Sequence, residues 1–205
     1  MRTTHSLIAS AVMVLLISGT FSTLAAQSTE AAADTTHLSM KAYCRSTGGV
    51  VEHRIPFFGT NNPRHTWLQL SGSEEFCQYT LADDGSRIHV SLSTLYTKKP
   101  TLAALAYYSL TQWNGQGNGN PASFYCTQLG GSDQFGGTNF GGGGWVAFGS
   151  NEIDQVLEAC VFPDNSVIDS WGLLYHSASI IRGTDLSTVL RYANPFTADK
   201  KEAKK

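Results

Sequence analysis

The chain has 205 residues, with 14 basic and 16 acidic side chains and a formal net charge of −2. Proteins that bind nucleic acid need a basic face for the phosphates, so this composition argues against nucleic acid as the main partner. The length suits one medium-sized domain or two small ones, and four cysteines in an exported chain favour disulfides over a metal site.

Residues 1–26 have the pattern of a secretory signal peptide. Arg2 is followed by an apolar run and then by small residues, with cleavage expected after Ala25 or Ala26. The alternative is a retained membrane helix, because the run approaches the length that spans a bilayer. Ser, Thr and Gly interrupt the run and no positive charges follow it, so the signal peptide is favoured. We therefore expect a secreted or periplasmic protein with no stable membrane span after cleavage.

The first half of the chain after the signal predicts one small unit. Residues 27–38 are small and polar and predict a flexible lead-in to a unit at 39–111. The elements expected in this unit are a short helix capped by Ser39 and ended by Gly48, strands at 65–71 and 87–96, and a helix at 100–110. The strand at 87–96 alternates apolar Ile88 and Val90 with His89 and Ser91, which is typical of a half-buried strand.

The second half repeats this order after a linker at 112–119. The sequence FYCTQLGG at 124–131 matches AYCRSTGG at 42–49. The elements expected here are a helix capped by Asn120 with Pro121 at its first position and Gly130 at its end, strands at 145–150 and 158–164, and a helix at 184–193. This unit spans 120–196, and a charged tail follows at 197–205. The predicted fold class is α+β: two related small units, each a short helix packed on an antiparallel sheet and stapled by one disulfide.

Four cysteines allow three pairings, and the repeat favours pairing within each half. Cys44 and Cys77 are 33 residues apart, and Cys126 and Cys160 are 34 apart. In each half, the first cysteine would lie in the helix and clamp it to the strand that carries the second. The predicted disulfides are Cys44–Cys77 and Cys126–Cys160, each worth roughly 3 kcal/mol of stability in the chain-entropy model.

The second half resembles a family of small exported bacterial domains of unknown function, many of which carry the haemolysin label. The matching residues are Asn120, Pro121, Ala122, Tyr125, Cys126, Gly130, Gly131, Cys160, Phe162, Pro163, Asp164, Ser166 and Trp171. A weaker match in the first half runs through Tyr43, Cys44, Gly48, Gly49, Cys77, Asp84, Gly85 and Ser86. Family members usually have a further cysteine pair near the Trp segment, whereas this chain has Ile168 near one of those positions and no cysteine after Trp171. The resemblance implies no established catalytic residues.

The glycine-rich segment at 114–150 is the most unusual part of the composition. It holds 12 of the 20 glycines and contains no Lys or Arg, so it does not predict a phosphate-binding loop. One interpretation is a mobile hairpin loop. Another is a ligand-binding loop, in which aromatic side chains stand beside flexible backbone. The candidate binding residues are Phe135, Phe140, Trp145 and Phe148.

Sequence motifs for catalysis are absent. The chain has neither Gly-x-Ser-x-Gly nor His-Glu-x-x-His, and its histidines are scattered singly. We therefore predict no catalytic residues, no metal and no cofactor. The favoured function is an exported, non-enzymatic binding module for a protein or a small ligand outside the cytoplasm, and an inhibitor-like role fits this class. The alternatives are a membrane-damaging protein and a hydrolase whose site is assembled from distant residues.

Overall fold

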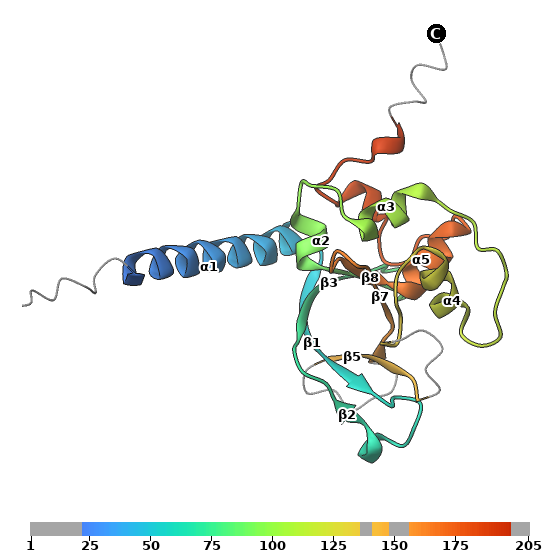
Figure 1. The fold of residues 1–205 in the computed structure, drawn as a ribbon. Helices are drawn as coiled ribbons and strands as arrows, with labels where there is room; N and C mark the ends of the chain where they lie inside the picture. Colours follow the sequence, from blue (N-terminus) through green and yellow to red (C-terminus); the bar gives the residue numbers. More distant parts are fainter. Residues whose placement is uncertain (1–21, 136–140, 148–155, 198–205) are drawn as a thin grey trace, which may run out of the picture. The chain divides into compact units, whose positions relative to one another are not determined.

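The computed structural model describes residues 22–135, 141–147 and 156–197 (Figure 1). The chain divides into two compact units, residues 1–36 and residues 37–205. The described residues of the first unit belong to helix α1 (Ser22–Ser46), which continues into the second unit. The strands and the other helices all lie in the second unit.

The second unit is built on one antiparallel sheet. Its strands are β1 (Val50–Phe58), β2 (Leu68–Gln69), β3 (Glu74–Thr80), β4 (Arg87–Ser91), β5 (Gly143–Ala147), β6 (Val156–Leu157), β7 (Ala159–Val161) and β8 (Val167–Asp169). Their order is β6-β5-β1-β3-β4-β8-β7, and β2 pairs with β1. The two ends of this order, β6 and β7, are consecutive in the chain and separated only by Glu158. The sheet therefore curls nearly into a barrel, with Glu158 at its seam.

Short helices follow the strands and cover one face of the sheet. They are α2 (Leu92–Tyr96), α3 (Leu102–Ser109), α4 (Pro121–Gln128) and α5 (Ser170–Ser177), with 3-10 turns at Arg64–Thr66, Leu186–Thr188 and Pro195–Thr197. Asn120 caps α4 as predicted, because its side chain accepts from the backbone N–H groups of Ala122 and Ser123. The predicted helix at 100–110 is α3, which is capped by Thr101.

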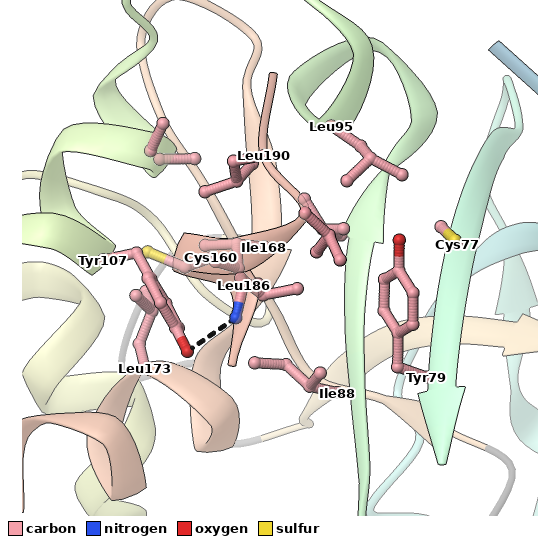
Figure 2. Packing of buried hydrophobic residues seen from close by; sticks show 14 of the residues in the cluster. Cys77, Tyr79, Ile88, Leu95, Tyr107, Cys160, Ile168, Leu173, Leu186 and Leu190 are labelled. Carbon is pink, nitrogen blue, oxygen red and sulfur yellow. Dashed lines mark hydrogen bonds between the residues drawn. The ribbon is translucent and has the colours of Figure 1, made fainter. Parts of the chain in front are cut away.

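The two faces of the sheet bury two different cores. The helix-side core lies between the sheet and the helices, where Tyr79, Ile88 and Ile168 of the strands meet Leu95 and Leu173 of α2 and α5 (Figure 2). The opposite face of the sheet holds a smaller inner core. It consists of Phe76, Leu157, Ala159 and Val167, with Trp145 and Val161 packed against them. Side chains alternate between the two faces along each strand.

Both disulfides have the predicted partners. Cys44 of α1 is bonded to Cys77 of β3, and Cys126 of α4 is bonded to Cys160 of β7. Gly49 and Gly131 follow the two helices and lie directly against these bonds. A Cβ atom at Gly49 would overlap Sγ of Cys77, and one at Gly131 would overlap Sγ of Cys160. The second glycine of each Gly-Gly pair therefore gives a disulfide room to reach its helix.

The two halves of the chain do not form separate units, contrary to the prediction. Their strands share one sheet: β1 pairs with β5, and β4 pairs with β8. Both halves also contribute side chains to the helix-side core. The coarser prediction of an α+β fold with antiparallel pairing and two disulfides is confirmed.

Several local predictions differ from the structure. Ser39 lies inside α1 and does not cap a helix, and the predicted strand at 87–96 is β4 followed by α2. Residues 27–38 are helical, because α1 begins at Ser22; the alanines in this stretch favour a helix over a flexible lead-in. The predicted helix at 184–193 is only the 3-10 turn Leu186–Thr188, which starts at the cap Asp185. The predicted strand at 65–71 is reduced to β2, which has two residues.

Candidate functional site

The face of the sheet that holds the inner core also carries a row of polar side chains. Glu52 and Arg54 come from β1, His89 from β4 and Asp169 from β8. Val90 pairs with Ile168 across the β4–β8 ladder, which places His89 opposite Asp169. Three strands that are distant in sequence therefore bring these four side chains to one place inside the nearly closed sheet.

Arg54 and Glu52 form a buried ion pair at the centre of this row. Arg54 is 2% exposed, and its Nε and Nη2 donate to Glu52 Oε2 at 2.8 and 2.6 Å. Its Nη1 donates to the carbonyl of Trp145 at 2.9 Å. Burial by itself would raise the pKa of Glu52, but the hydrogen bond with His89 and the charge of Arg54 outweigh it and lower this pKa to about 2. Glu52 is therefore a carboxylate at any ordinary pH.

His89 connects this pair to Asp169. The imidazole is 5% exposed; its Nδ1 lies 3.3 Å from Asp169 Oδ2 and its Nε2 lies 3.3 Å from Glu52 Oε2. The other carboxylate oxygen of Asp169 accepts from the backbone N–H of Gly172 at 2.8 Å and so caps α5. Both nitrogens of His89 are thus occupied by neighbouring protein groups, which fixes the ring.

Glu158 at the barrel seam accepts hydrogen bonds from three side chains. Its Oε2 accepts from Asn120 Nδ2 at 2.5 Å and from Trp171 Nε1 at 2.8 Å, and its Oε1 accepts from Gln134 Nε2 at 2.9 Å. Its backbone carbonyl accepts from Ser170 N at 3.0 Å. Glu158 therefore ties the start of α4 and the start of α5 to the seam of the sheet.

Asp133 is a further carboxyl group, and it is wholly buried. Its side chain is 0% exposed, and Oδ2 makes no hydrogen bond of standard geometry. Burial, together with the nearby negative charge of Glu158, raises the pKa of Asp133 to about 7. Asp133 does not line the mouth cleft, and its Oδ1 accepts from the backbone N–H of Gln134 at 2.6 Å.

A cleft of about 250 Å³ opens at this end of the sheet, and we call it the mouth cleft. It is lined by Arg54, Arg87, His89, Val156, Leu157, Glu158, Asp169, Trp171 and Arg182. The mouths of β-barrels are common places for small-molecule sites. Most of the polar lining is already held by the hydrogen bonds described above, so the walls of the mouth cleft are preorganised.

Comparisons with family models, with curated proteins and with solved structures gave no significant match. The haemolysin-family resemblance of the second half therefore stays a prediction.

Of the four aromatic residues predicted to bind a ligand, the two that the structure describes, Phe135 and Trp145, do not line the mouth cleft. Trp145 is in β5, where its ring packs edge-on against Phe76 and Phe135 at 5.7 and 5.8 Å between centroids. Trp145 and Phe135 therefore come together, as part of the inner core and its border. Phe140 and Phe148 lie outside the described residues.

The described residues offer few groups for covalent or metal chemistry. All four cysteines are in disulfides. No set of three or more His, Cys, Asp or Glu side chains could hold a metal ion within the described part of the chain. Among the helices of that part, none is long and apolar enough to cross a membrane.

Sequence reasoning missed the residues that line the mouth cleft. One signal was available: the segment Glu52-His53-Arg54 places opposite charges two residues apart, and hence on one face if the segment is a strand. A second signal was His89 inside an otherwise apolar strand. Neither signal identifies a shared site, because the contact between β4 and β8 is set by tertiary structure.

Proposed function

We propose that this protein is an exported binding module that takes a small polar ligand into the mouth cleft. The observation that carries this proposal is the cleft itself, a polar hollow whose side chains are held in place by protein hydrogen bonds. Arg54, His89 and Glu158 are each fixed by two or more neighbours. Side chains that are already fixed lose little conformational entropy when a ligand binds, so preorganisation increases affinity.

The arrangement supports binding more than catalysis. A general base needs a nitrogen or oxygen free to reach the substrate, yet both nitrogens of His89 face protein carboxylates. Ser170 is next to Asp169, but its hydroxyl oxygen is buried. A hydrolase site assembled from distant residues would need one of these groups to be free of its protein partners and open to the cleft.

The size of the mouth cleft limits the ligand. At about 250 Å³ it is smaller than the roughly 300–1,000 Å³ of pockets for drug-sized molecules. A ligand of a few non-hydrogen atoms, or one group of a larger molecule, fits this space. The predicted signal peptide and the two disulfides support a location outside the cytoplasm.

Corresponding features in the two halves support an origin by duplication. Asp84 accepts from Ser86 N in the turn before β4, and Asp164 accepts from Ser166 N in the turn before β8. The residue between them has a positive φ in both turns. We propose that β4 and β8 are equivalent strands of two related halves fused into one sheet, so that the mouth cleft lies where the halves meet.

A thermal-shift screen of the oxidised protein tests the binding function. The library contains neutral, anionic and cationic molecules of up to about ten non-hydrogen atoms, a size set by the small volume of the cleft. Val156→Trp fills the mouth cleft, and Val50→Trp, the same substitution at an exposed strand position, is the control. We expect compounds that stabilise the wild type and Val50→Trp but not Val156→Trp. Finding no stabilising compound, or finding that they act equally on Val156→Trp, would contradict the proposal.

A further inference from the structure

Two arginines from different segments of the chain line the mouth cleft. Arg87 begins β4, and Arg182 lies in the segment after α5. The segments that carry them are in contact, because Gly183 N donates to the side-chain Oγ of Ser86 at 3.3 Å. A Cβ atom at Gly183 would overlap the carbonyl oxygen of Tyr79 and would lie 2.8 Å from the backbone nitrogen of Ile88. The chain neighbours of both arginines are therefore in direct backbone contact.

Neither of these guanidinium groups has an anionic partner in the described protein. The side chains of Arg87 and Arg182 make no hydrogen bond or ion pair to another described residue, although the guanidinium group of Arg182 lies over the ring of Tyr175 at 5.0 Å. The hydrogen bonds from Ser86 and, to a smaller extent, the charge of Arg182 lower the pKa of Asp84. Asp84 and Arg182 nevertheless form no ion pair.

The carboxylates of the cleft are, by contrast, already engaged. Glu158 accepts from three side chains, and Asp169 faces His89 and caps α5. Glu52, which does not itself line the cleft, is paired with Arg54. The guanidinium groups of Arg87 and Arg182 are therefore available to donate hydrogen bonds to a ligand. The carboxylates of the cleft already accept hydrogen bonds from the protein.

We infer that the ligand of the mouth cleft carries an anionic group, a carboxylate or a phosphate, held by Arg87 and Arg182. This inference rests on the proposed binding function. Guanidinium groups bind both anions through paired N–H donors, with stronger hydrogen bonds than those between neutral groups. The rest of the ligand would lie against the indole of Trp171 and the side chains of Val156 and Leu157, which also line the cleft.

An NMR titration of the full oxidised protein tests this inference. The indole N–H signal of Trp171 reports on the cleft, because this group lies in its wall. The probes are acetate and inorganic phosphate, with acetamide and methylammonium as a neutral and a cationic counterpart of acetate. The variants are Arg87→Gln, Arg182→Gln and Arg87→Lys, and Arg64→Gln is the control because Arg64 lies over Trp67 and does not line the cleft.

Acetate, phosphate or both are expected to shift the Trp171 signal in a saturable way, while acetamide and methylammonium do not. Arg87→Gln and Arg182→Gln should each weaken the anion affinity about tenfold or more, since a hydrogen bond to a charged group is lost. Arg87→Lys should be intermediate, and Arg64→Gln should match the wild type. A stronger response to phosphate than to acetate would favour a phosphate ligand, and the reverse would favour a carboxylate.

Two results would overturn the inference in distinguishable ways. If acetamide or methylammonium binds in the cleft and the anions do not, or if both glutamine variants bind anions as the wild type does, the anionic class is wrong and the binding function stands. If no probe shifts the Trp171 signal and the thermal-shift screen also finds no cleft ligand, the binding function itself fails.

Discussion

Asp169 faces His89 across the β4–β8 ladder, with Asp169 Oδ2 3.3 Å from His89 Nδ1. The two residues come from different halves of the chain, so their contact forms one of the junctions at which the halves share a sheet. The same aspartate caps α5, and the same histidine reaches Glu52. The wall of the mouth cleft is therefore also part of what holds the sheet together.

A double-mutant cycle measures this contact. We expect His89→Gln and Asp169→Asn each to reduce the free energy of unfolding by about 1–3 kcal/mol, because each leaves a buried polar partner unsatisfied. The double variant should lose less than the sum of the two, with a coupling energy of at least about 0.5 kcal/mol. Urea unfolding with the disulfides intact gives these values. Additive losses would show that the two side chains do not interact.

The Glu52–Arg54 pair predicts sensitivity to acid. The pKa of Glu52 falls from 4.5 to about 2 on folding, so its contribution is present above pH 4.5 and is lost as the pH falls towards 2. Glu52→Gln should destabilise the protein by about 3–5 kcal/mol at pH 7, because it leaves the Arg54 charge buried without its carboxylate.

The double variant Glu52→Gln/Arg54→Met is the matched control for this pair. It removes both charges, and it should recover part of the lost stability in urea unfolding at pH 7. A single variant as stable as the wild type would rule out a structural role for the pair.

Asp133 predicts the opposite dependence on pH. Its pKa rises from 3.8 to about 7 on folding, so the folded state binds the proton more tightly than the unfolded state. Stability should therefore fall as the pH rises from about 4 to 7, by on the order of 4 kcal/mol for this group. Asp133→Asn should remove this loss and be more stable than the wild type at pH 8.

Asp83→Asn, at an exposed position, is the control for Asp133 and should keep the wild-type profile. Thermal unfolding of the three proteins between pH 4 and 8 makes the comparison. An Asp133→Asn profile that runs parallel to that of the wild type would show that Asp133 does not titrate in this range.

The two glycines after α1 should respond differently to alanine. Gly48 has φ +90° and open space around it, so Gly48→Ala should cost about 1–2 kcal/mol from the backbone alone. Gly49→Ala should cost more, because its methyl group would overlap the Cys44–Cys77 disulfide. Gly131→Ala should act in the same way on Cys126–Cys160. Urea unfolding ranks the variants, and equal losses at Gly48 and Gly49 would contradict the role given to the second glycine.

Local features of this fold could be predicted because their causes are local. The cap at Asn120 and the glycines after α1 and α4 depend on a few neighbouring residues. The disulfide partners followed from the repeated spacing. The strand predicted at 87–96 corresponds to β4 followed directly by α2, and the prediction gave it only one buried face. His89 and Ser91 are in fact buried as well, because the sheet curls and encloses its second face.

Other features depend on contacts between distant residues. β1 was not predicted as a strand, because it has Pro56 at a paired position and proline is uncommon inside sheets. In the structure the carbonyl of Pro56 accepts from Leu70 N at 2.9 Å. Trp145 was predicted to bind a ligand because it stands beside glycines in the sequence. In the structure its ring instead packs against Phe76 of β3 in the inner core. The mouth cleft combines side chains from β1, β4, β8 and the seam, and no local pattern joins them.

A crystal structure of the oxidised protein grown with selenate tests the central claim most directly. Selenate is a tetrahedral dianion, and the anomalous scattering of selenium locates it without ambiguity. We predict an anomalous peak in the mouth cleft, within hydrogen-bonding distance of the guanidinium groups of Arg87 and Arg182. Selenate bound at other surface arginines, with no peak in the cleft, would contradict the assignment of this cleft as the ligand site.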